Sequence, residues 1–246
     1  MITNTSTFSS IKRYMKLVTT KSKPLILIGP VDLPIDVDGQ TYLFKWYTWL
    51  TEDNVKEGDT LEDVYTMLEG KPLAHKQLSS ILVYGDFESQ DEAYVRLHSI
   101  CHTGDVFGSL LCDCGEQFKA ARRMIVKEGC GAIFYLADQE GRGIGLYHKA
   151  MAYLLQKQGL DTVEANKVLG FEDDLRSYDE AISVLKILRN LPINLITNNS
   201  HKVKELRQGG IAINKRIPVW CEMTEYNERY IETKIERSGH IKGKLT

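Results

Sequence analysis

Three cysteines within fourteen residues place the strongest single constraint on how this chain can fold. The stretch CHTGDVFGSLLCDCG holds Cys101, Cys112 and Cys114, whereas Cys130 and Cys221 lie apart from it. Three protein ligands with a fourth position open to water are typical of a catalytic zinc site. A structural site would need a fourth ligand, which a nearby histidine could supply. The remaining alternative is that the cysteines are buried as small apolar side chains.

Length and composition limit the classes of protein to consider. The chain has 246 residues, 43% of them hydrophobic, with a net charge of -2. This length allows one large domain or two small ones, and the charge gives no overall attraction to nucleic acid or anionic membranes. No apolar run approaches the ~20 residues of a membrane helix. Five cysteines and no recognisable secretory signal predict a reducing compartment, the cytoplasm. The basic, Ser- and Thr-rich residues 1–31 leave organelle targeting as the alternative.

The hydrophobic spacing changes near Gly115. Before it, strands are predicted at LILIG, TYLFKWYTW, SILVYGDF and AYVRLHS. After it, helices at GEQFKAARRMIVKEG, IGLYHKAMAYLLQKQ, SYDEAISVLKILRNL and SHKVKELRQ alternate with strands at GAIFYLA, INLITN and IAINKRIPVW. We therefore predict an α+β fold, with a mainly β portion over residues 25–115 that carries the cysteines, followed by alternating helices and strands over residues 116–220. DTVEANKVLGFEDDLR is predicted mostly as loop, and Ser200 as a helix N-cap.

The predicted organisation is a single catalytic domain between two tails. The domain covers residues 25–225, the tail of residues 1–24 is basic and polar, and the tail of residues 226–246 is charged with a helical pattern. The acidic stretch 51–80 is interpreted as an insertion that contains a short helix at LEDVYTML.

Three loops have the composition of an anion-binding site. DQEGRGIG offers the backbone N–H groups of a glycine-rich turn, a helix N-terminus and Arg142. TNNSHK offers Thr197 and Lys202, and EDDLR offers Asp174 and Arg176. The last pair could be a base beside a nucleophile, or a phosphate clamp. Each loop also occurs as an ordinary turn, capped loop or surface ion pair, so none of them alone fixes a function.

Taken in order, these motifs resemble GTP cyclohydrolase II, the enzyme that opens the riboflavin pathway. The matching strings are VRLHSICHTGDVFGSLLCDCGEQF, DQEGRGIGL, DTVEAN, LGFEDDLR, LITNNSHKV and NERYIETK, over roughly residues 32 to 240. The resemblance implies that water attacks C8 of the guanine of GTP, which opens the imidazole ring. Formate and pyrophosphate are released, and the product is 2,5-diamino-6-(5-phosphoribosylamino)pyrimidin-4-one. Zinc, magnesium and a homodimer are implied too, without nucleic-acid or membrane partners.

The resemblance also implies roles for individual residues. The zinc ligands would be Cys101, Cys112 and Cys114. Tyr153 would take part in ring opening, Arg176 would be the nucleophile on the α-phosphorus, and Asp174 the proton acceptor. Because arginine is almost always protonated, a phosphate clamp is the alternative role of Arg176. The residues implied to contact GTP are Arg96, His98, Ser99, Gln117, Glu140, Gly141, Arg142, Thr162, Thr197 and Lys202.

Three positions depart from the pattern that is usual in this family. Ile100 stands where glutamate is common, and Leu111 and Asp138 stand where arginine is common. These changes make the surroundings of the metal and phosphate sites about two charges more negative, which is unfavourable for binding a triphosphate. Two alternatives follow. The chain could be a divergent paralogue that acts on another purine nucleotide or in a secondary pathway, or a non-catalytic zinc protein that binds GTP as a sensor.

Overall fold

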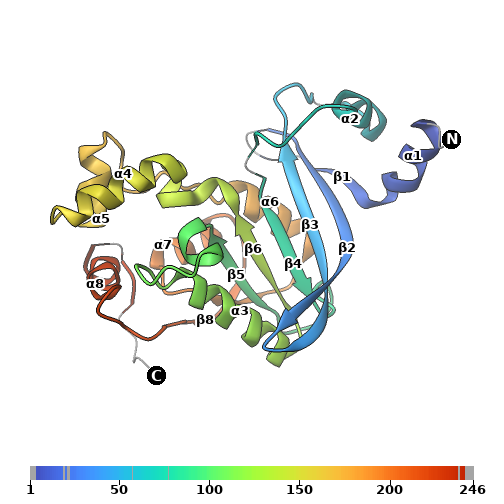
Figure 1. Ribbon diagram of the computed structural model, residues 1–246. Helices are drawn as coiled ribbons and strands as arrows, with labels where there is room; N and C mark the ends of the chain where they lie inside the picture. Colours follow the sequence, from blue (N-terminus) through green and yellow to red (C-terminus); the bar gives the residue numbers. More distant parts are fainter. Residues whose placement is uncertain are drawn as a thin grey trace.

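One mixed sheet, eight strands wide within the described residues, organises the molecule (Figure 1). The computed structural model describes residues 4–18, 20, 23–56, 58–76, 78–237 and 239–241. Parts of the predicted tails, residues 1–3, 19, 21, 22, 238 and 242–246, lie outside these ranges, as do residues 57 and 77 of the predicted insertion.

The sheet has an antiparallel half and a parallel half. The antiparallel half consists of β1 (Met15–Val18), β2 (Leu25–Val37), β3 (Gln40–Thr51) and β4 (Ser80–Tyr84). The parallel half consists, in sheet order, of β6 (Gly131–Leu136), β5 (Tyr94–Ser99), β7 (Ile193–Ile196) and β8 (Ile213–Ile217). The predicted mixture of a strand-rich portion and an alternating portion is confirmed. Both portions contribute to one sheet, because β5 of the first portion lies between β6 and β7 of the second.

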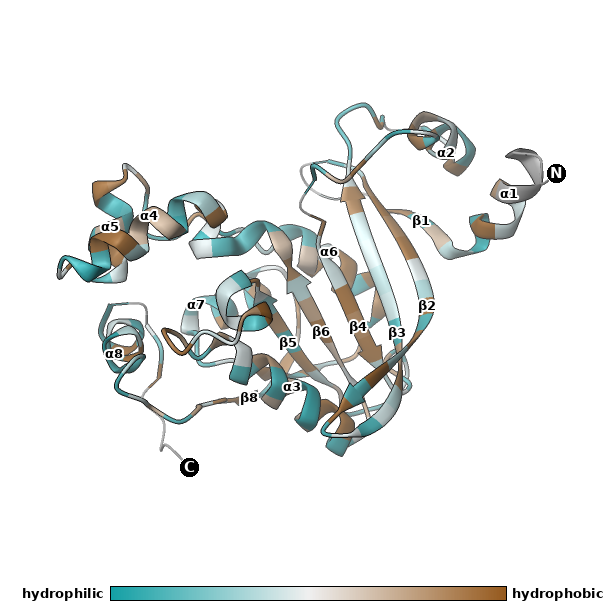
Figure 2. Ribbon diagram, in the orientation of Figure 1, coloured by the Kyte–Doolittle hydropathy of each residue, from teal (hydrophilic) through white to brown (hydrophobic). Residues whose placement is uncertain are grey.

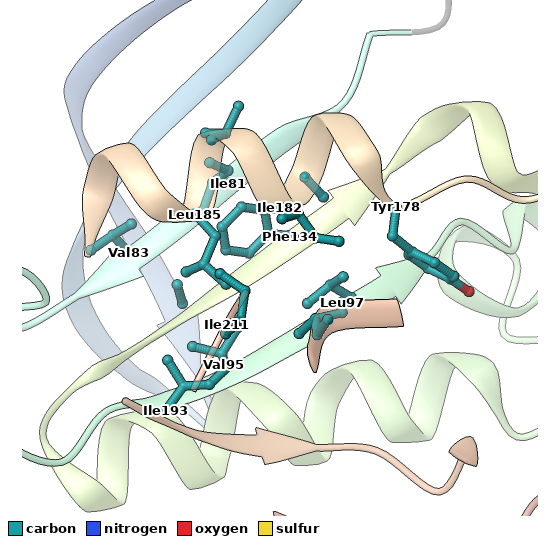
Figure 3. Packing of buried hydrophobic residues seen from close by; sticks show 14 of the residues in the cluster. Ile81, Val83, Val95, Leu97, Phe134, Tyr178, Ile182, Leu185, Ile193 and Ile211 are labelled. Carbon is teal, nitrogen blue, oxygen red and sulfur yellow. The ribbon is translucent and has the colours of Figure 1, made fainter. Parts of the chain in front are cut away.

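Helices cover both faces of the parallel half. Successive residues of β6 point to opposite faces, as in any strand. Ile133 packs with Ala121 and Ile125 of α3 (Cys114–Glu128). Phe134 packs on the other face with α6 (Asp179–Leu188) and with α7 (Ser200–Gln208), as Figure 3 shows for Ile182 and Leu185. Figure 2 shows that hydrophobic residues dominate these central strands and α6. Burial on both faces explains why these strands are continuous apolar runs.

Most of the helices after Gly115 were predictable, but one short helix was missed and one N-cap prediction is wrong. The stretch DTVEANKVLGFEDDLR, predicted mostly as loop, contains a helix, α5 (Thr162–Val168). It begins with a capping box, in which the Asp161 side chain accepts from the N–H of Glu164 and the Glu164 side chain accepts from the N–H of Asp161. The N-cap of α7 is Asn199, whose side chain accepts from the N–H of His201, and not Ser200. The remaining helix of this half, α4, covers Gly145–Lys157.

A second, smaller core lies at the β1 edge of the sheet, far from the parallel half (Figure 1). It joins α1 (Asn4–Ile11) and β1, which belong to the predicted N-terminal tail, to α2 (Leu61–Leu68) of the predicted insertion. Its buried members are Phe8, Met15, Ile26, Leu50, Val55 and Val64. A short 3-10 helix, η1 (Lys12–Tyr14), connects α1 to β1. The division into domain and tails stays a prediction, although these segments pack together.

The predicted C-terminal tail contains helix α8 (Glu228–Arg237), which lies against α5. The guanidinium of Arg237 forms an ion pair of 2.6 Å with Asp161. In the described part of the chain, the helices are too short or too polar to cross a lipid bilayer.

Candidate active site

A pocket opens at the carboxyl ends of β5, β6 and β7, the edge at which parallel α/β sheets usually bind ligands. The chain leaves β5 through Ile100 and Cys101, and leaves β7 through residues 197–199. It leaves β6 through the irregular helical turn η3 (Ala137–Gly143). The predicted site residues that line the pocket are Arg96, His98, Ser99, Cys101, Cys112, Cys114, Gln117, Glu140, Gly141, Arg142, Tyr153, Thr162, Arg176, Thr197 and Lys202. Asp174, the remaining predicted residue, contacts Arg176 from outside this set.

The three cysteine sulfur atoms converge as a metal site requires. The Sγ atoms of Cys101 and Cys112 are 3.5 Å apart, and the three sulfur atoms all lie within 4.8 Å of one another. Tetrahedral zinc with bonds of about 2.3 Å holds its sulfur ligands about 3.8 Å apart. Gly104 in the π-helical turn η2 (His102–Val106) permits this approach, because a Cβ atom there would lie only 2.9 Å from the Cys112 sulfur. The donor set therefore fits a metal ion with three thiolate ligands.

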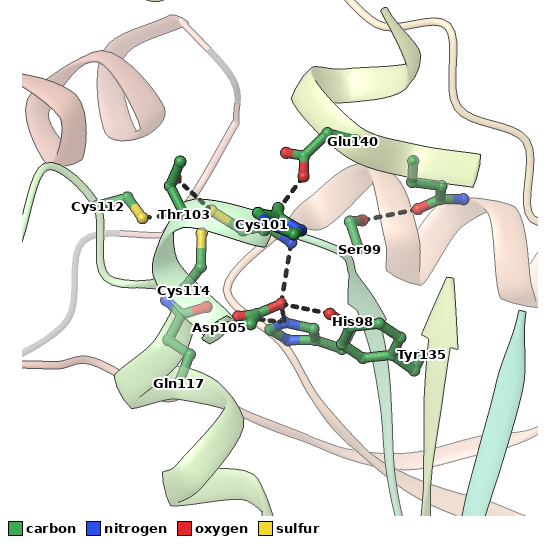
Figure 4. A network of polar contacts seen from close by, with 12 residues as sticks. His98, Ser99, Cys101, Thr103, Asp105, Cys112, Cys114, Gln117, Tyr135 and Glu140 are labelled. Atoms are coloured by element: carbon green, nitrogen blue, oxygen red, sulfur yellow. Dashed lines mark hydrogen bonds and ion pairs between the residues drawn. The ribbon is translucent and has the colours of Figure 1, made fainter. Parts of the chain in front are cut away.

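Asp105 fixes the loop that carries Cys101 (Figure 4). Its carboxylate accepts from the N–H of Cys101 at 2.9 Å, from Nε2 of His98 at 3.0 Å and from the hydroxyl of Tyr135 at 3.1 Å. Nδ1 of His98 accepts from Nε of Arg96. Burial lowers the pKa of His98 to about 4, so the ring is neutral. Both ring nitrogens are engaged within the protein, so His98 positions the metal loop even though it borders the pocket.

Lys149 of α4 connects the metal cluster to the glycine turn. Its ammonium donates to Oε1 of Glu140 at 2.7 Å and to the Cys101 sulfur at 3.2 Å. Burial alone lowers the pKa of Lys149, but the Cys101 and Glu140 charges outweigh it and raise that pKa above its ordinary value. A buried cation beside a sulfur-rich site offsets the excess negative charge of three thiolates. Sequence reasoning missed this role, although Lys149 lies one helical turn before Tyr153.

Two tyrosines flank the sulfur atoms. The hydroxyl of Tyr153 lies 3.2 Å from Oγ1 of Thr103, which is 3.7 Å from the Cys101 sulfur. The hydroxyl of Tyr230, on α8, lies 3.8 Å from the Cys114 sulfur. Burial raises the pKa of both phenols, so each remains protonated near neutral pH. Tyr230 lies in the matching string NERYIETK, but no role was assigned to it from the sequence.

Helix α8 also contributes a buried ion pair. Lys234 donates to Oδ1 of Asp113 at 2.6 Å, and both side chains are nearly inaccessible to solvent. Oδ2 of Asp113 accepts from Nε2 of Gln117, whose Oε1 accepts from Arg96 at 2.7 Å. Arg96 and Gln117, both implied to contact GTP, are therefore already hydrogen-bonded beside the pocket. Lys234 was missed because its partner lies 121 residues away in the sequence.

The glycine turn adopts left-handed backbone conformations. Gly141, Arg142 and Gly143 have φ values of 60°, 66° and 94°. Positive φ is uncommon for a residue with a side chain, and such conformations concentrate at functional sites. The guanidinium of Arg142 forms an ion pair of 2.6 Å with Asp173. The turn thus exposes backbone and one arginine at the pocket.

Cationic side chains gather around the hydroxyl of Ser99, and we call this part the cationic end of the pocket. Arg176 donates to this hydroxyl at 3.2 Å and Lys202 at 3.3 Å. Lys202 also donates to the carbonyl of Leu97, and burial, reinforced by Arg176 and Arg96, lowers its pKa well below the usual value. Arg176 makes a two-point contact with Asp174, at 2.7 and 2.5 Å.

The remaining predicted residues border this cationic end or the neighbouring wall. The hydroxyl of Thr197 accepts from the N–H of Asn199, so it shapes the turn after β7. Thr162 is the first residue of α5 and lines both the main pocket and a second one between α4, α5 and α8.

The three departures from the usual family pattern occupy different surroundings. Ile100 lines the main pocket next to Cys101. Leu111 is 46% exposed and lines the second pocket instead. Asp138 lies at the surface within η3 and borders neither pocket. Ile100 is therefore the departure placed to contact a ligand in the main pocket.

Comparison with known proteins shows the family of the chain. The model of the GTP cyclohydrolase II family matches residues 70–218, and the chain belongs to that family of enzymes. It is 48% identical over 162 residues to a GTP cyclohydrolase-2 from Picrophilus torridus, an alignment that covers 66% of this chain and 84% of that protein.

Two other relatives are longer proteins. The chain is 48% identical over 160 residues to the riboflavin biosynthesis protein RibBA of Bacillus subtilis, covering 65% of this chain and 40% of the relative. It is 41% identical over 233 residues to RibBA of Chlorobium phaeovibrioides, covering 94% of this chain and 55% of the relative. The chain thus spans about half or less of the length of these RibBA proteins.

Proposed function

We propose that the chain opens the imidazole ring of GTP and releases formate and pyrophosphate, the first step of riboflavin biosynthesis. The observation that carries this proposal is a pocket that joins a three-cysteine cluster to a group of cationic side chains. Ring opening at C8 needs an activated water, and pyrophosphate release needs cations around the polyphosphate. Relatives named GTP cyclohydrolase-2 and RibBA support the same activity.

Cys101, Cys112 and Cys114 would hold zinc. When bound there, zinc would supply Lewis-acid activation of water beside the guanine. Lys149 would offset the charge of the thiolates and hold the Cys101 sulfur in place through its donated hydrogen bond. The Tyr153 hydroxyl, close to Thr103, would orient a water or move a proton at the same end of the pocket.

Glu140 is proposed to recognise the guanine edge, whose N1 and N2 groups are donors. A carboxylate offers about four acceptor positions. Three are used by Lys149, by the N–H of His102 at 2.7 Å and by the N–H of Gly141 at 3.2 Å. Among the described residues no partner fills the fourth position, and the longest bond, to Gly141, is the one that guanine would replace. Recognition by Glu140 therefore includes a small local rearrangement of the glycine turn.

Arg176 is proposed as a clamp on the α-phosphate rather than a nucleophile. Burial by itself lowers the pKa of Arg176, but Tyr178 and the Asp174 carboxylate outweigh it and raise that pKa above its ordinary value. A guanidinium that stays protonated lacks the lone pair a nucleophile needs, whereas its planar donors match phosphate oxygens. Asp174 would hold the clamp in position or accept a proton from water. Lys202 and Thr197 would bind the outer phosphates with Arg142, and Ser99 would complete this wall.

Magnesium, a homodimer and a cytoplasmic location belong to the same proposal. Magnesium would neutralise the polyphosphate as pyrophosphate leaves. A second copy of the chain would cover the apolar side chains exposed on α4, which are Leu146, Tyr147, Met151 and Leu154.

A divergent paralogue is the second candidate, and Ile100 is the observation that favours it. This apolar side chain lines the pocket beside Cys101, where an acid is usual in the family. Another purine base could prefer such a wall. A non-catalytic sensor of GTP is less well supported, because Tyr153, Asp174 and Arg176 are all present.

One assay separates these possibilities. Purified, zinc-loaded protein is incubated with GTP and magnesium, and formate and pyrophosphate are measured in the same reaction. Both products in equal amounts are expected. Pyrophosphate alone would mean that ring opening is disabled and would implicate Ile100. Neither product, with zinc bound, would contradict the proposal and direct the assay to other purine nucleotides.

A further inference from the structure

The end of the described chain folds back onto the loop after β7. The N–H of Ile241 donates to the carbonyl of Asn198 at 3.1 Å, and His240 pairs with Asn199 in an antiparallel bridge. The N–H of His240 donates to the carbonyl of Lys234 at 3.2 Å. These bonds place His240 in the wall of the main pocket, next to the buried residues 197–199. Residues 239–241 lie beyond the region that the family model matches.

The His240 ring carries a polar atom without a partner. Its Nδ1 is buried and makes no hydrogen bond to any described residue. A buried polar group left unbonded is unfavourable, so such atoms are rare unless a ligand or water completes them. His240 borders the pocket but its Nδ1 is closed to solvent, so a ligand there supplies the missing partner once the imidazole turns about its side-chain torsion.

The charges that face His240 identify the ligand as an anion. Burial, together with the positive charges of Lys234, Lys202 and Arg176 and against the opposing charge of Asp113, lowers the pKa of His240 to about 3. These cations come from α8, from α7 and from the loop before α6, and Asp113 precedes α3. An anion bound among them would bring acceptor oxygens to the imidazole and favour its protonated form.

We infer that His240 is a further ligand of the polyphosphate, donating from Nδ1 to a phosphate oxygen at the cationic end of the pocket. This inference rests on the proposed function, since it assumes that a nucleoside triphosphate fills the pocket. It assigns the C-terminal segment to the substrate site, completing the wall formed by Lys202 and residues 197–199.

The test uses the full-length, zinc-loaded protein and pyrophosphate as the probe, with binding measured by isothermal titration calorimetry in the presence of magnesium. His240→Phe keeps a ring but removes the donor, and His240→Asn keeps an amide donor near the position of Nδ1. His201→Phe, on the exposed side of α7, is the matched control. Zinc content and thermal unfolding of each variant verify that it folds.

We expect His240→Phe to weaken pyrophosphate binding by about tenfold to a hundredfold, the range for one hydrogen bond to a charged group. His240→Asn should stay within about threefold of the wild type, and His201→Phe within about twofold. The wild type should also take up more protons on binding than His240→Phe, measured from the enthalpy in buffers of different ionisation heat.

Two results would overturn the inference. One is pyrophosphate binding that is equally tight in His240→Phe and the wild type, and the other is a wild type that binds no pyrophosphate. The proposed function fails separately. Suppose that the wild type releases no formate from GTP while His240→Phe still loses pyrophosphate binding. The role of His240 in binding polyphosphate is then supported, and the proposed ring-opening reaction is contradicted.

Discussion

Two groups of side chains in the pocket differ in how their charges are balanced. The metal end is the group beside the three cysteines, and the phosphate end is the group around Ser99 and His240, where the polyphosphate is proposed to bind. At the metal end, Lys149 is paired with Glu140 and the Cys101 sulfur, and Lys234 is paired with Asp113. At the phosphate end, Lys202 donates to two neutral oxygens, and Nδ1 of His240 has no partner among the described residues. The lysines of the metal end are paired within the protein. At the phosphate end Arg176 is paired with Asp174, but the charge of Lys202 is left to be balanced by a ligand.

This difference predicts opposite effects on stability. Removing one partner of a buried ion pair leaves an uncompensated charge and destabilises the fold. Removing a buried cation that repels its neighbours relieves strain, at a cost in binding, as is common at functional sites. Substitutions at the metal end should therefore reduce both the stability of the fold and the rate of ring opening. Substitutions at the phosphate end should mainly reduce the affinity for GTP.

The largest effect is expected for Cys112→Ser. Loss of one sulfur ligand should remove the metal and lower formate release by at least about a thousandfold. Pyrophosphate release should persist, because the phosphate end is intact. Metal analysis and parallel assays of both products check this, with Cys130→Ser, outside the cluster, as the control. Equal loss of both products would show that the two ends do not act separately.

Lys149→Met should lower zinc affinity by about tenfold to a hundredfold, the usual range for a group that supports a metal ligand. The free energy of unfolding of the metal-free protein should fall by about 3 kcal/mol, since Glu140 stays buried without its partner. Urea unfolding and zinc titration measure the two effects. Lys157→Met, exposed near the end of the same helix, is the control. An unchanged free energy of unfolding would contradict the claim that Lys149 balances the charge of Glu140 at the metal end.

Lys202→Met should raise the KM for GTP by about 30-fold or more. Its free energy of unfolding should stay equal or rise by about 1 kcal/mol near neutral pH. The folded-state pKa of Lys202 is lowered, chiefly by burial, so the wild type carries a penalty while the unfolded lysine is charged. That penalty should disappear as pH rises above about 10.4, where the lysine is neutral in both states.

Unfolding curves of wild type and Lys202→Met at several pH values check the sign. Lys204→Met, an exposed neighbour on α7, should change neither KM nor stability. A clear loss of stability in Lys202→Met at neutral pH would mean that the phosphate end is balanced like the metal end.

The smallest effect on activity is expected for Val64→Ala in the second core. Val64 is 1% exposed, and its truncation should cost about 2 kcal/mol of stability. Because this core lies at the far edge of the sheet, kcat and KM should stay within about twofold at a temperature where the variant is folded. Steady-state kinetics and thermal unfolding measure both. A large change in KM would connect this core to the pocket.

Periodicity predicted the elements that are long and strongly patterned. The runs at α3 and β6 were correctly placed, because α3 has a regular apolar stripe and β6 is an uninterrupted apolar strand. Helix α5 was missed because it is only seven residues long, so its pattern is weak. Its capping box between Asp161 and Glu164 was the local signal that would have found it.

The sequence by itself determined the kinds of chemistry available: three closely spaced thiols, a glycine turn and cationic loops. Only the tertiary structure decided which charges meet there. Lys234 reaches Asp113 across 121 residues, and His240 reaches the loop after β7 through backbone bonds. The reason is physical: interaction energies between charges depend on their distance and burial in space, which sequence separation does not reveal.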